Sequence, residues 1–122
     1  MSSLYMKLTP DNVADYVIFS GDPFRVDVLK DLLDEPKRVA FSREFNTYTG
    51  SYQGIPITVT STGIGSPSAA IAMEEMAANG MKVAIRMGTV MGLRDDMLGK
   101  YSIPLGAMRD EATTKTYVRR SY

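Results

Sequence analysis

Arginines and small residues gather where three apolar stretches of this 122-residue chain end. "VIFSGDPFRV" (17–26) stops at a serine and a glycine and then places Arg25. "TSTGIGSPS" (60–68) carries two glycines, and "AIRMGT" (84–89) carries Arg86 just before its glycine. Glycine lets backbone N–H groups approach a ligand, and guanidinium groups bind anionic oxygens. Because open α/β sheets bind ligands where their strands end, these stretches predict a site for a small anion.

Arg86 also poses a question of charge. "KVAIRMG" (82–88) is typical of a short buried strand, in which a charged side chain is costly unless it is paired. Two kinds of partner fit. One is Asp22 or Glu44 in a structural ion pair, and the other is a bound phosphate held by the guanidinium fork.

Composition excludes several classes of protein. There is no cysteine and no histidine, so disulfides, thiol nucleophiles, Ser-His-Asp triads and Cys/His zinc sites are ruled out. Fourteen basic and fourteen acidic residues give a formal net charge of zero, which argues against a nucleic-acid or membrane-surface binder. We interpret Asp95-Asp96 as solvated loop residues. With neither a membrane-length apolar run nor a signal-peptide pattern, the expected location is the cytoplasm.

The patterns along the chain predict one α/β domain over 1–122, with a tail over 111–122 that need not be ordered. Asp22 is a suitable cap for the first helix, and Pro36 is interpreted as its breaker. Ser66 is the expected cap of the second helix, and Gln53-Gly54 is typical of a hairpin turn. The expected strands are 16–20, 44–54, 55–62, 82–88 and 101–109. The expected helices are 23–34 and one that follows a glycine-rich turn within 63–80. This order favours a layered fold with a mixed sheet.

Three segments also carry a family resemblance. "GDPFRV", "REFNTYTGSYQGIPITVTSTGIGSPSAAIAMEE" and "IRMGT" occur in this order. Together they resemble the nucleoside phosphorylase family, which includes uridine phosphorylase and hexameric purine nucleoside phosphorylase, from about residue 8 to about residue 118. The resemblance implies a three-layer α-β-α fold with a mixed central sheet. It also implies phosphorolysis, in which a nucleoside and phosphate give free base and ribose 1-phosphate, with phosphate as co-substrate and no required cofactor.

The resemblance assigns roles to particular residues. Gly21 would offer its backbone N–H to phosphate, and Arg25, Arg86 and Thr89 would bind the same anion. Arg43 would reach into the phosphate site of a neighbouring subunit, so the working unit would be a homodimer or a larger homo-oligomer. Thr89 favours uridine over a purine nucleoside, and the purine alternative stays open.

Some uridine phosphorylases bind a monovalent cation such as K⁺ between subunits. The matching positions here are Glu44, the carbonyl of Ile64 and Ser68. The alternative for Glu44 is a salt bridge to an arginine.

The chain departs from the family in several ways. "GTVMGL" has Met91 where the family usually has glycine, and the histidine that uridine phosphorylases use near ribose is missing. Family members are about twice as long, and their second half carries the Glu-Met-Glu segment that grips ribose. We therefore expect an unpaired sheet edge that favours oligomers. The alternatives to a phosphorylase are a non-catalytic phosphate-binding or partner subunit and a truncated gene product.

Overall fold

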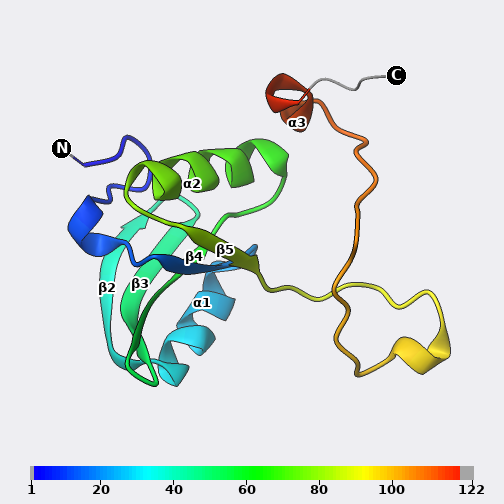
Figure 1. The fold of residues 1–122 in the computed structure, drawn as a ribbon, viewed down its shortest axis with the longest axis horizontal. Helices are drawn as coiled ribbons and strands as arrows, with labels where there is room; N and C mark the ends of the chain where they lie inside the picture. Colours follow the sequence, from blue (N-terminus) through cyan, green and yellow to red (C-terminus); the bar gives the residue numbers. More distant parts are fainter. Residues whose placement is uncertain (1, 119–122) are drawn as a thin grey trace. The chain divides into compact units, whose positions relative to one another are not determined.

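The computed structural model describes residues 2–118 and divides the chain into two compact units, Met1–Met87 and Gly88–Tyr122. The first unit holds a five-stranded sheet in the order β2-β3-β4-β1-β5 (Figure 1). Its strands are β1 (Tyr16–Ser20), β2 (Asp34–Ser42), β3 (Phe45–Tyr52), β4 (Ile55–Ser61) and β5 (Val83–Arg86), and its helices are α1 (Pro23–Leu29) and α2 (Ser66–Ala78).

Strand direction explains where a site can form. β4, β1 and β5 run parallel, whereas β2, β3 and β4 are joined antiparallel by tight turns. The predicted mixed sheet is thus confirmed. The carboxyl ends of the three parallel strands meet at one edge, and the β2–β3 turn lies at the same edge because β3 opposes β4.

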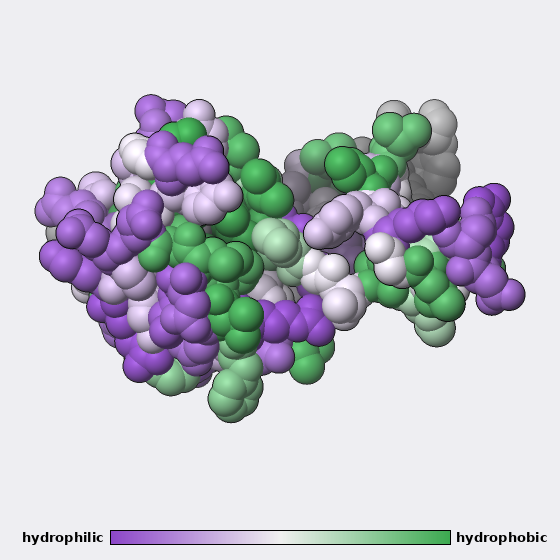
Figure 2. All heavy atoms as spheres, turned by 90° about the horizontal axis from the view of Figure 1, so that it is seen from below, coloured by the Kyte–Doolittle hydropathy of each residue, from purple (hydrophilic) through white to green (hydrophobic). Residues whose placement is uncertain are grey.

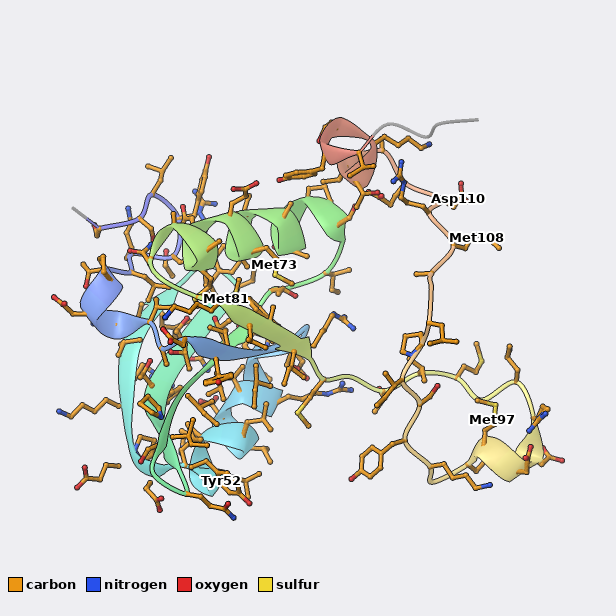
Figure 3. The ribbon with its side chains drawn as sticks, in the orientation of Figure 1. Tyr52, Met73, Met81, Met97, Met108 and Asp110 are labelled. Atoms are coloured by element: carbon orange, nitrogen blue, oxygen red, sulfur yellow. The ribbon has the colours of Figure 1, made fainter. Side chains whose placement is uncertain are left out.

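One helix covers each face of this sheet, which confirms the three-layer arrangement (Figure 1). Side chains alternate along β1, so Val17 and Phe19 pack on the α2 side while Ile18 packs on the α1 side. The α2-side core comprises Met6, Leu8, Val17, Phe19, Phe45, Ala72 and Met76, all buried. Met73 and Met81 pack against it (Figure 3), and Val26, Tyr48 and Val59 form the core under α1. Burying each large apolar side chain contributes about 1.5–3 kcal/mol.

Helix α1 starts as predicted but is shorter. The Asp22 carboxylate accepts from the Phe24 N–H at 2.9 Å, and Pro23 occupies the first turn, where its missing N–H costs nothing. The α-helix ends at Leu29 and continues as a single 3₁₀ turn, Lys30–Leu32. The predicted span 23–34 was therefore too long.

The strand that follows was missed. Asp34–Ser42 forms β2, although Pro36 lies within it. Proline removes a backbone donor and is tolerated on an edge strand, and β2 is the outer strand beside β3. The pairing shifts register between Asp34 and Lys37, around the proline. Interpreting Pro36 as the helix breaker was wrong, because the helical turns end at Leu32 and the chain is already in β2 at Pro36.

Two turn predictions have different outcomes. Gln53 and Gly54 join β3 to β4 with positive φ values of 50° and 79°, as a two-residue hairpin turn requires. At the start of α2, however, Ser66 is the first helical residue and Gly65, with φ 95°, is the cap. Ser66 was thus predicted one residue out of place.

Strand β5 differs from expectation in its burial. All four of its residues are exposed, because β5 pairs only with β1 among the described residues and forms the other edge of the sheet. The predicted buried strand was wrong, and the cost of burying the charge of Arg86 does not arise. Apolar side chains remain exposed on β5 and on α1, such as Ile85 at 52% and Phe24 at 80%. The face that carries α1 indeed shows a band of apolar side chains (Figure 2).

The second unit contains little regular structure in its described residues. A 3₁₀ turn at Asp95–Met97 and the short helix α3 (Thr113–Tyr117) are separated by irregular chain. The predicted strand 101–109 does not form, and Tyr101, Ile103 and Leu105 are exposed. Of the predicted tail 111–122, the structure describes a helix at its start, and residues 119–122 lie outside the described part. None of the helices within 2–118 is both long enough and apolar enough to cross a membrane.

Candidate functional site

A pocket of about 540 Å³ opens at the carboxyl edge of the sheet. Backbone hydrogen bonds hold the loops there: the Thr62 N–H donates to the Ser20 carbonyl, and the Met87 N–H donates to the Phe19 carbonyl, both at 2.8 Å. The pocket is lined by Gly21, Asp22, Pro23, Glu44, Gly63 and Ile64. Three stretches that lie far apart in the sequence thus meet where the strand order predicts a ligand site.

Gly21 and Arg86 lie together in this edge. A Cβ placed on Gly21 would be 3.6 Å from Nη2 of Arg86 and 3.5 Å from the carbonyl oxygen of Gly63. Both distances are ordinary contacts, and Gly21 has no positive φ, so its backbone conformation does not require glycine. The missing side chain instead keeps the space beside the guanidinium open. A group bound there would meet both the Gly21 backbone and a cation.

Arg86 does not form the structural ion pair that was one alternative. Within residues 2–118 no acidic side chain lies within salt-bridge distance of it. Asp22 caps α1 instead, and the Glu44 carboxylate accepts from the Ser68 hydroxyl at 2.8 Å. The two acids proposed as partners are therefore engaged elsewhere.

Position 63 requires a glycine, both because of its backbone conformation and because of the side chains next to it. Its φ is 70°, in the left-handed region, and a Cβ there would lie 2.6 Å from Cγ of Glu44 and 3.3 Å from Oγ of Ser68. The Ser68 hydroxyl also contacts the Thr62 carbonyl. The absence of a side chain at Gly63 thus lets Glu44 and Ser68 approach each other across the loop.

Glu44 is negatively charged at neutral pH. Its own backbone N–H and the Ser68 hydroxyl donate to its carboxylate, and the positive charge of Arg43 adds to their effect, so the pKa of Glu44 is below its ordinary value despite the opposing effect of burial. One wall of the pocket therefore carries an anion, while Arg86 places a cation near Gly21.

The remaining predicted residues lie in different places. Arg25 is in the first turn of α1, where its backbone N–H donates to the Asp22 carbonyl at 3.2 Å. Arg43 is exposed at the β2–β3 turn with φ 55°, and its guanidinium lies 5.7 Å from the ring centre of Tyr5. Ile64 is 98% exposed at the pocket. Thr89 belongs to the second unit, Gly88–Tyr122, and its role as a phosphate ligand stays a prediction.

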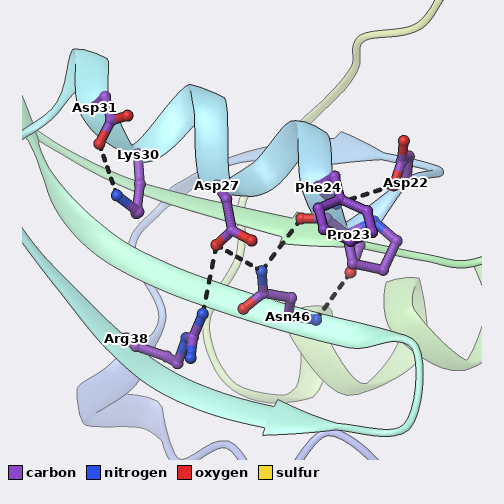
Figure 4. Close-up of polar contacts among 9 residues, drawn as sticks. Asp22, Pro23, Phe24, Asp27, Lys30, Asp31, Arg38 and Asn46 are labelled. Carbon is purple, nitrogen blue, oxygen red and sulfur yellow. Dashed lines mark hydrogen bonds and ion pairs between the residues drawn. The ribbon is translucent and has the colours of Figure 1, made fainter.

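Sequence reasoning missed the polar residues beneath the pocket. Asn46 is buried on β3 and donates to the carbonyl of Pro23, and Ser61 on β4 donates to the carbonyl of Glu44 (Figure 4 draws the contacts of Asn46). The available signal was one amide in a strand whose other residues are phenylalanine, threonine, tyrosine, glycine and serine. That signal alone does not reveal which loop an amide contacts.

Comparison with known proteins decides the family. The model of the phosphorylase superfamily matches residues 15–121. The chain belongs to the phosphorylase superfamily. A uridine phosphorylase of Thermococcus kodakarensis is 48% identical over 114 residues, which are 93% of this chain and 41% of the relative. A guanosine phosphorylase of Halorubrum lacusprofundi is 42% identical over 112 residues, which are 91% of this chain and 46% of the relative.

Solved structures of phosphorylases share the fold. Uridine phosphorylase from Vibrio fischeri superposes with a TM-score of 0.69 at 38% identity, covering 70% of this chain and 36% of that one. The resemblance drawn from the three sequence segments is thus confirmed, as is the phosphorylase-type α/β fold. The chain spans less than half the length of these phosphorylases.

Proposed function

We propose that this chain forms the phosphate-binding part of a nucleoside phosphorylase that cleaves uridine to uracil and ribose 1-phosphate. The observation that carries the proposal is the approach of the Arg86 guanidinium to Gly21, a residue that lines the pocket. The names of the phosphorylase relatives support the reaction class. A guanidinium beside an open glycine backbone suits a phosphate oxygen, because charged and N–H donors both favour the anion.

In this reaction a phosphate oxygen forms a bond to C1′ of the nucleoside while the C1′–N bond to the base breaks. The electron pair of that bond leaves with the base, which takes up a proton. Gly21 and Arg86 would hold the phosphate, with Arg25 and Thr89 as further ligands predicted from the sequence. Their work is to bind and orient the dianion and so to lower the entropic cost of the attack. Phosphate serves as co-substrate, and the chain needs no cofactor for this role.

The acidic wall of the pocket suggests a second ion. Glu44 repels a phosphate dianion unless a cation lies between them. The Glu44 carboxylate and the Ser68 hydroxyl are oxygen donors 2.8 Å apart, and Ile64 follows Gly63 in the same loop. Oxygen donors of this kind fit a hard cation. We propose that these two side chains and the carbonyl of Ile64 hold a monovalent cation such as K⁺.

The proposal includes association of chains. Arg43 is exposed at the tip of the β2–β3 turn, from which a side chain is well placed to reach another copy. We propose a homodimer or larger homo-oligomer in which Arg43 completes the phosphate site of its neighbour. The cytoplasmic location expected from the sequence stays a prediction.

An assay of base release tests the proposal. The chain is incubated with uridine, inosine or guanosine in phosphate buffer, and free base is quantified for the wild type, Arg86→Ala and Arg94→Ala. The last variant is a matched control, because Arg94 belongs to the second unit, pairs with Asp96 and is not among the lining residues of the pocket. The proposal predicts phosphate-dependent release that is fastest with uridine, is lost in Arg86→Ala and persists in Arg94→Ala. Release that survives Arg86→Ala contradicts it.

The pocket also suits one alternative function, because Gly21 and Arg86 offer donors to an anion whether or not a nucleoside is cleaved. That alternative is a phosphate-binding or partner subunit without turnover of its own. Phosphate binding without release of any base supports that alternative, and a preference for inosine or guanosine supports the purine alternative.

A further inference from the structure

Asn46 lies beneath the start of α1, on a strand that contributes no predicted phosphate ligand (Figure 4). It is 1% exposed, and its Nδ2 donates to the carbonyl of Pro23 at 3.2 Å and to Oδ1 of Asp27 at 3.1 Å. Pro23 stands between Gly21 and Arg25 in the sequence. The bond to its carbonyl therefore fixes the short segment that carries two of the proposed phosphate ligands.

The orientation of this amide follows from its partners. Both neighbours are oxygen acceptors, so only the NH₂ end of Asn46 can face them. The Oδ1 of Asn46 is buried and has no hydrogen-bond partner within the described residues. An unpaired buried oxygen lowers stability, so the hydrogen bonds that this amide contributes come from its NH₂ end. The arrangement favours a role for the two N–H bonds themselves.

Hydrogen bonds also connect Asn46 to the opposite wall of the pocket. The backbone N–H of Asn46 donates to Oγ of Ser61 at 2.8 Å, and the Ser61 hydroxyl donates to the carbonyl of Glu44. Pro23 and Glu44 both line the pocket. Asn46 thus connects one wall, at the start of α1, to the other wall, at the β2–β3 turn.

We propose that Asn46 is a positioning residue of the anion site, which holds the Gly21–Arg25 segment against the sheet through the carbonyl of Pro23. This inference rests on the proposed phosphate site and adds to it a residue that does not touch the ligand. We expect the affinity for phosphate to depend on the hydrogen bond from Asn46 to the Pro23 carbonyl and not on the one from Asn46 to Asp27.

Two variants separate the two bonds. Asp27→Asn keeps an acceptor for the Asn46 amide, so both bonds of Asn46 remain while the contact of Asp27 with Arg38 is weakened. The double variant Asn46→Asp with Asp27→Asn reverses the pair: the new amide at position 27 donates to the new carboxylate at position 46. The side-chain pair is retained, but the Pro23 carbonyl loses its donor. The two variants share the altered contact with Arg38 and differ in the Pro23 bond. They also differ in charge, because the double variant keeps the single carboxylate of the wild-type pair at position 46 whereas Asp27→Asn has none, so the uncharged variant described below is needed to separate the two effects.

The experiment measures binding of inorganic phosphate by calorimetry, together with the denaturant midpoint of unfolding, for wild type and both variants. We expect Asp27→Asn to bind within about twofold of wild type, and the double variant to bind at least about fivefold more weakly, since it loses one hydrogen bond. Equal phosphate affinity in the two variants overturns the inference while leaving the phosphate site intact. No binding by the wild type overturns the phosphate site, and the inference falls with it.

A second measurement covers the case in which the double variant does not fold. Asn46→Ser is uncharged and too short to reach both acceptors. Hydrogen exchange followed by mass spectrometry compares a peptide spanning residues 20–26 with one from α2. We expect faster exchange in 20–26 while protection of α2 stays at the wild-type level. Unchanged protection of 20–26 contradicts the positioning role.

Discussion

Replacing Gly63 with alanine is predicted to damage both the stability of the fold and the pocket. Gly63 has φ 70°, and its missing Cβ would lie 2.6 Å from Cγ and 3.1 Å from Cβ of Glu44. A change of the Glu44 rotamer moves Cγ but leaves the 3.1 Å contact with Cβ, which is fixed to the backbone and is tighter than an ordinary contact. The β2–β3 turn that carries Glu44 must shift away from the glycine loop.

Two costs add in this variant. A left-handed conformation costs an L-residue about 1–2 kcal/mol. Forcing an extra carbon into a filled space costs about 1–3 kcal/mol. The sum is about 2–5 kcal/mol of unfolding free energy. For a unit the size of Met1–Met87, each kcal/mol corresponds to about 4–8 °C in Tm, so even the lower bound predicts a fall of about 8–16 °C.

Gly54→Ala is the matched control. Gly54 has φ 79°, yet a Cβ there meets nothing within 4 Å, so only the conformational cost of about 1–2 kcal/mol applies. Urea unfolding of both variants isolates the contact with Glu44 as the difference between them. Gly63→Ala should also weaken binding at the pocket, whereas Gly54→Ala should not. Equal losses of stability in the two variants would refute the steric reasoning.

Three further predictions follow from buried or exposed contacts of the first unit. Thr47→Val should lower the unfolding free energy in urea by about 1–3 kcal/mol, because it leaves the buried hydroxyl of Thr60 without its partner at 2.7 Å. The double variant with Thr60→Val should recover most of the loss, and a double variant without recovery would contradict this explanation. Burial alone raises the pKa of Glu75. The backbone N–H groups of residues 5 and 6 donate to its carboxylate and together have the larger, opposite effect, so the folded-state pKa lies below the ordinary 4.5. The stability it adds is then full above that pH and lost as the pH falls through the folded pKa, and unfolding curves of Glu75→Gln and wild type should converge on acidification; a gap independent of pH contradicts this. Ile85 is exposed on the edge strand β5, so Ile85→Lys should reduce the self-association that light scattering detects. A wild-type protein that is a monodisperse monomer would contradict the expected oligomer.

Short-range patterns allowed the sheet centre and its turns to be predicted from sequence. Apolar runs bounded by glycine and proline located β1 and β4, and Gln53-Gly54 located the hairpin turn, because these signals act within a few residues. The glycine and arginine positions of the pocket followed from the same strand ends. Strand order then brought Gly21, Gly63 and Arg86 to one edge.

What the sequence did not predict depends on tertiary neighbours. Pro36 was interpreted as a helix breaker, but the helical turns end at Leu32, before it. The position of β2 at the sheet edge makes a strand that contains proline acceptable. Arg86 was expected to be buried because its neighbours are apolar, yet an edge strand leaves them exposed. The alternation of Tyr101, Ile103 and Leu105 is typical of a strand, but a strand needs a partner to pair with.

The role of Asn46 could not be predicted for a related reason. An amide in a strand has several possible partners, and the choice depends on which loop crosses above it. Here the crossing segment is the start of α1, whose residues lie 19 and 23 positions away in sequence. No local pattern indicates such a contact.

A titration with inorganic phosphate, followed by ¹H–¹⁵N NMR of the glycine amides, tests the phosphate site directly. We expect a saturable shift of the Gly21 amide, little change at Gly54 on the far hairpin turn, and loss of the Gly21 response in Arg86→Ala but not in Arg94→Ala. A Gly21 amide that does not respond, or that responds equally in Arg86→Ala, would contradict a phosphate site built from Gly21 and Arg86.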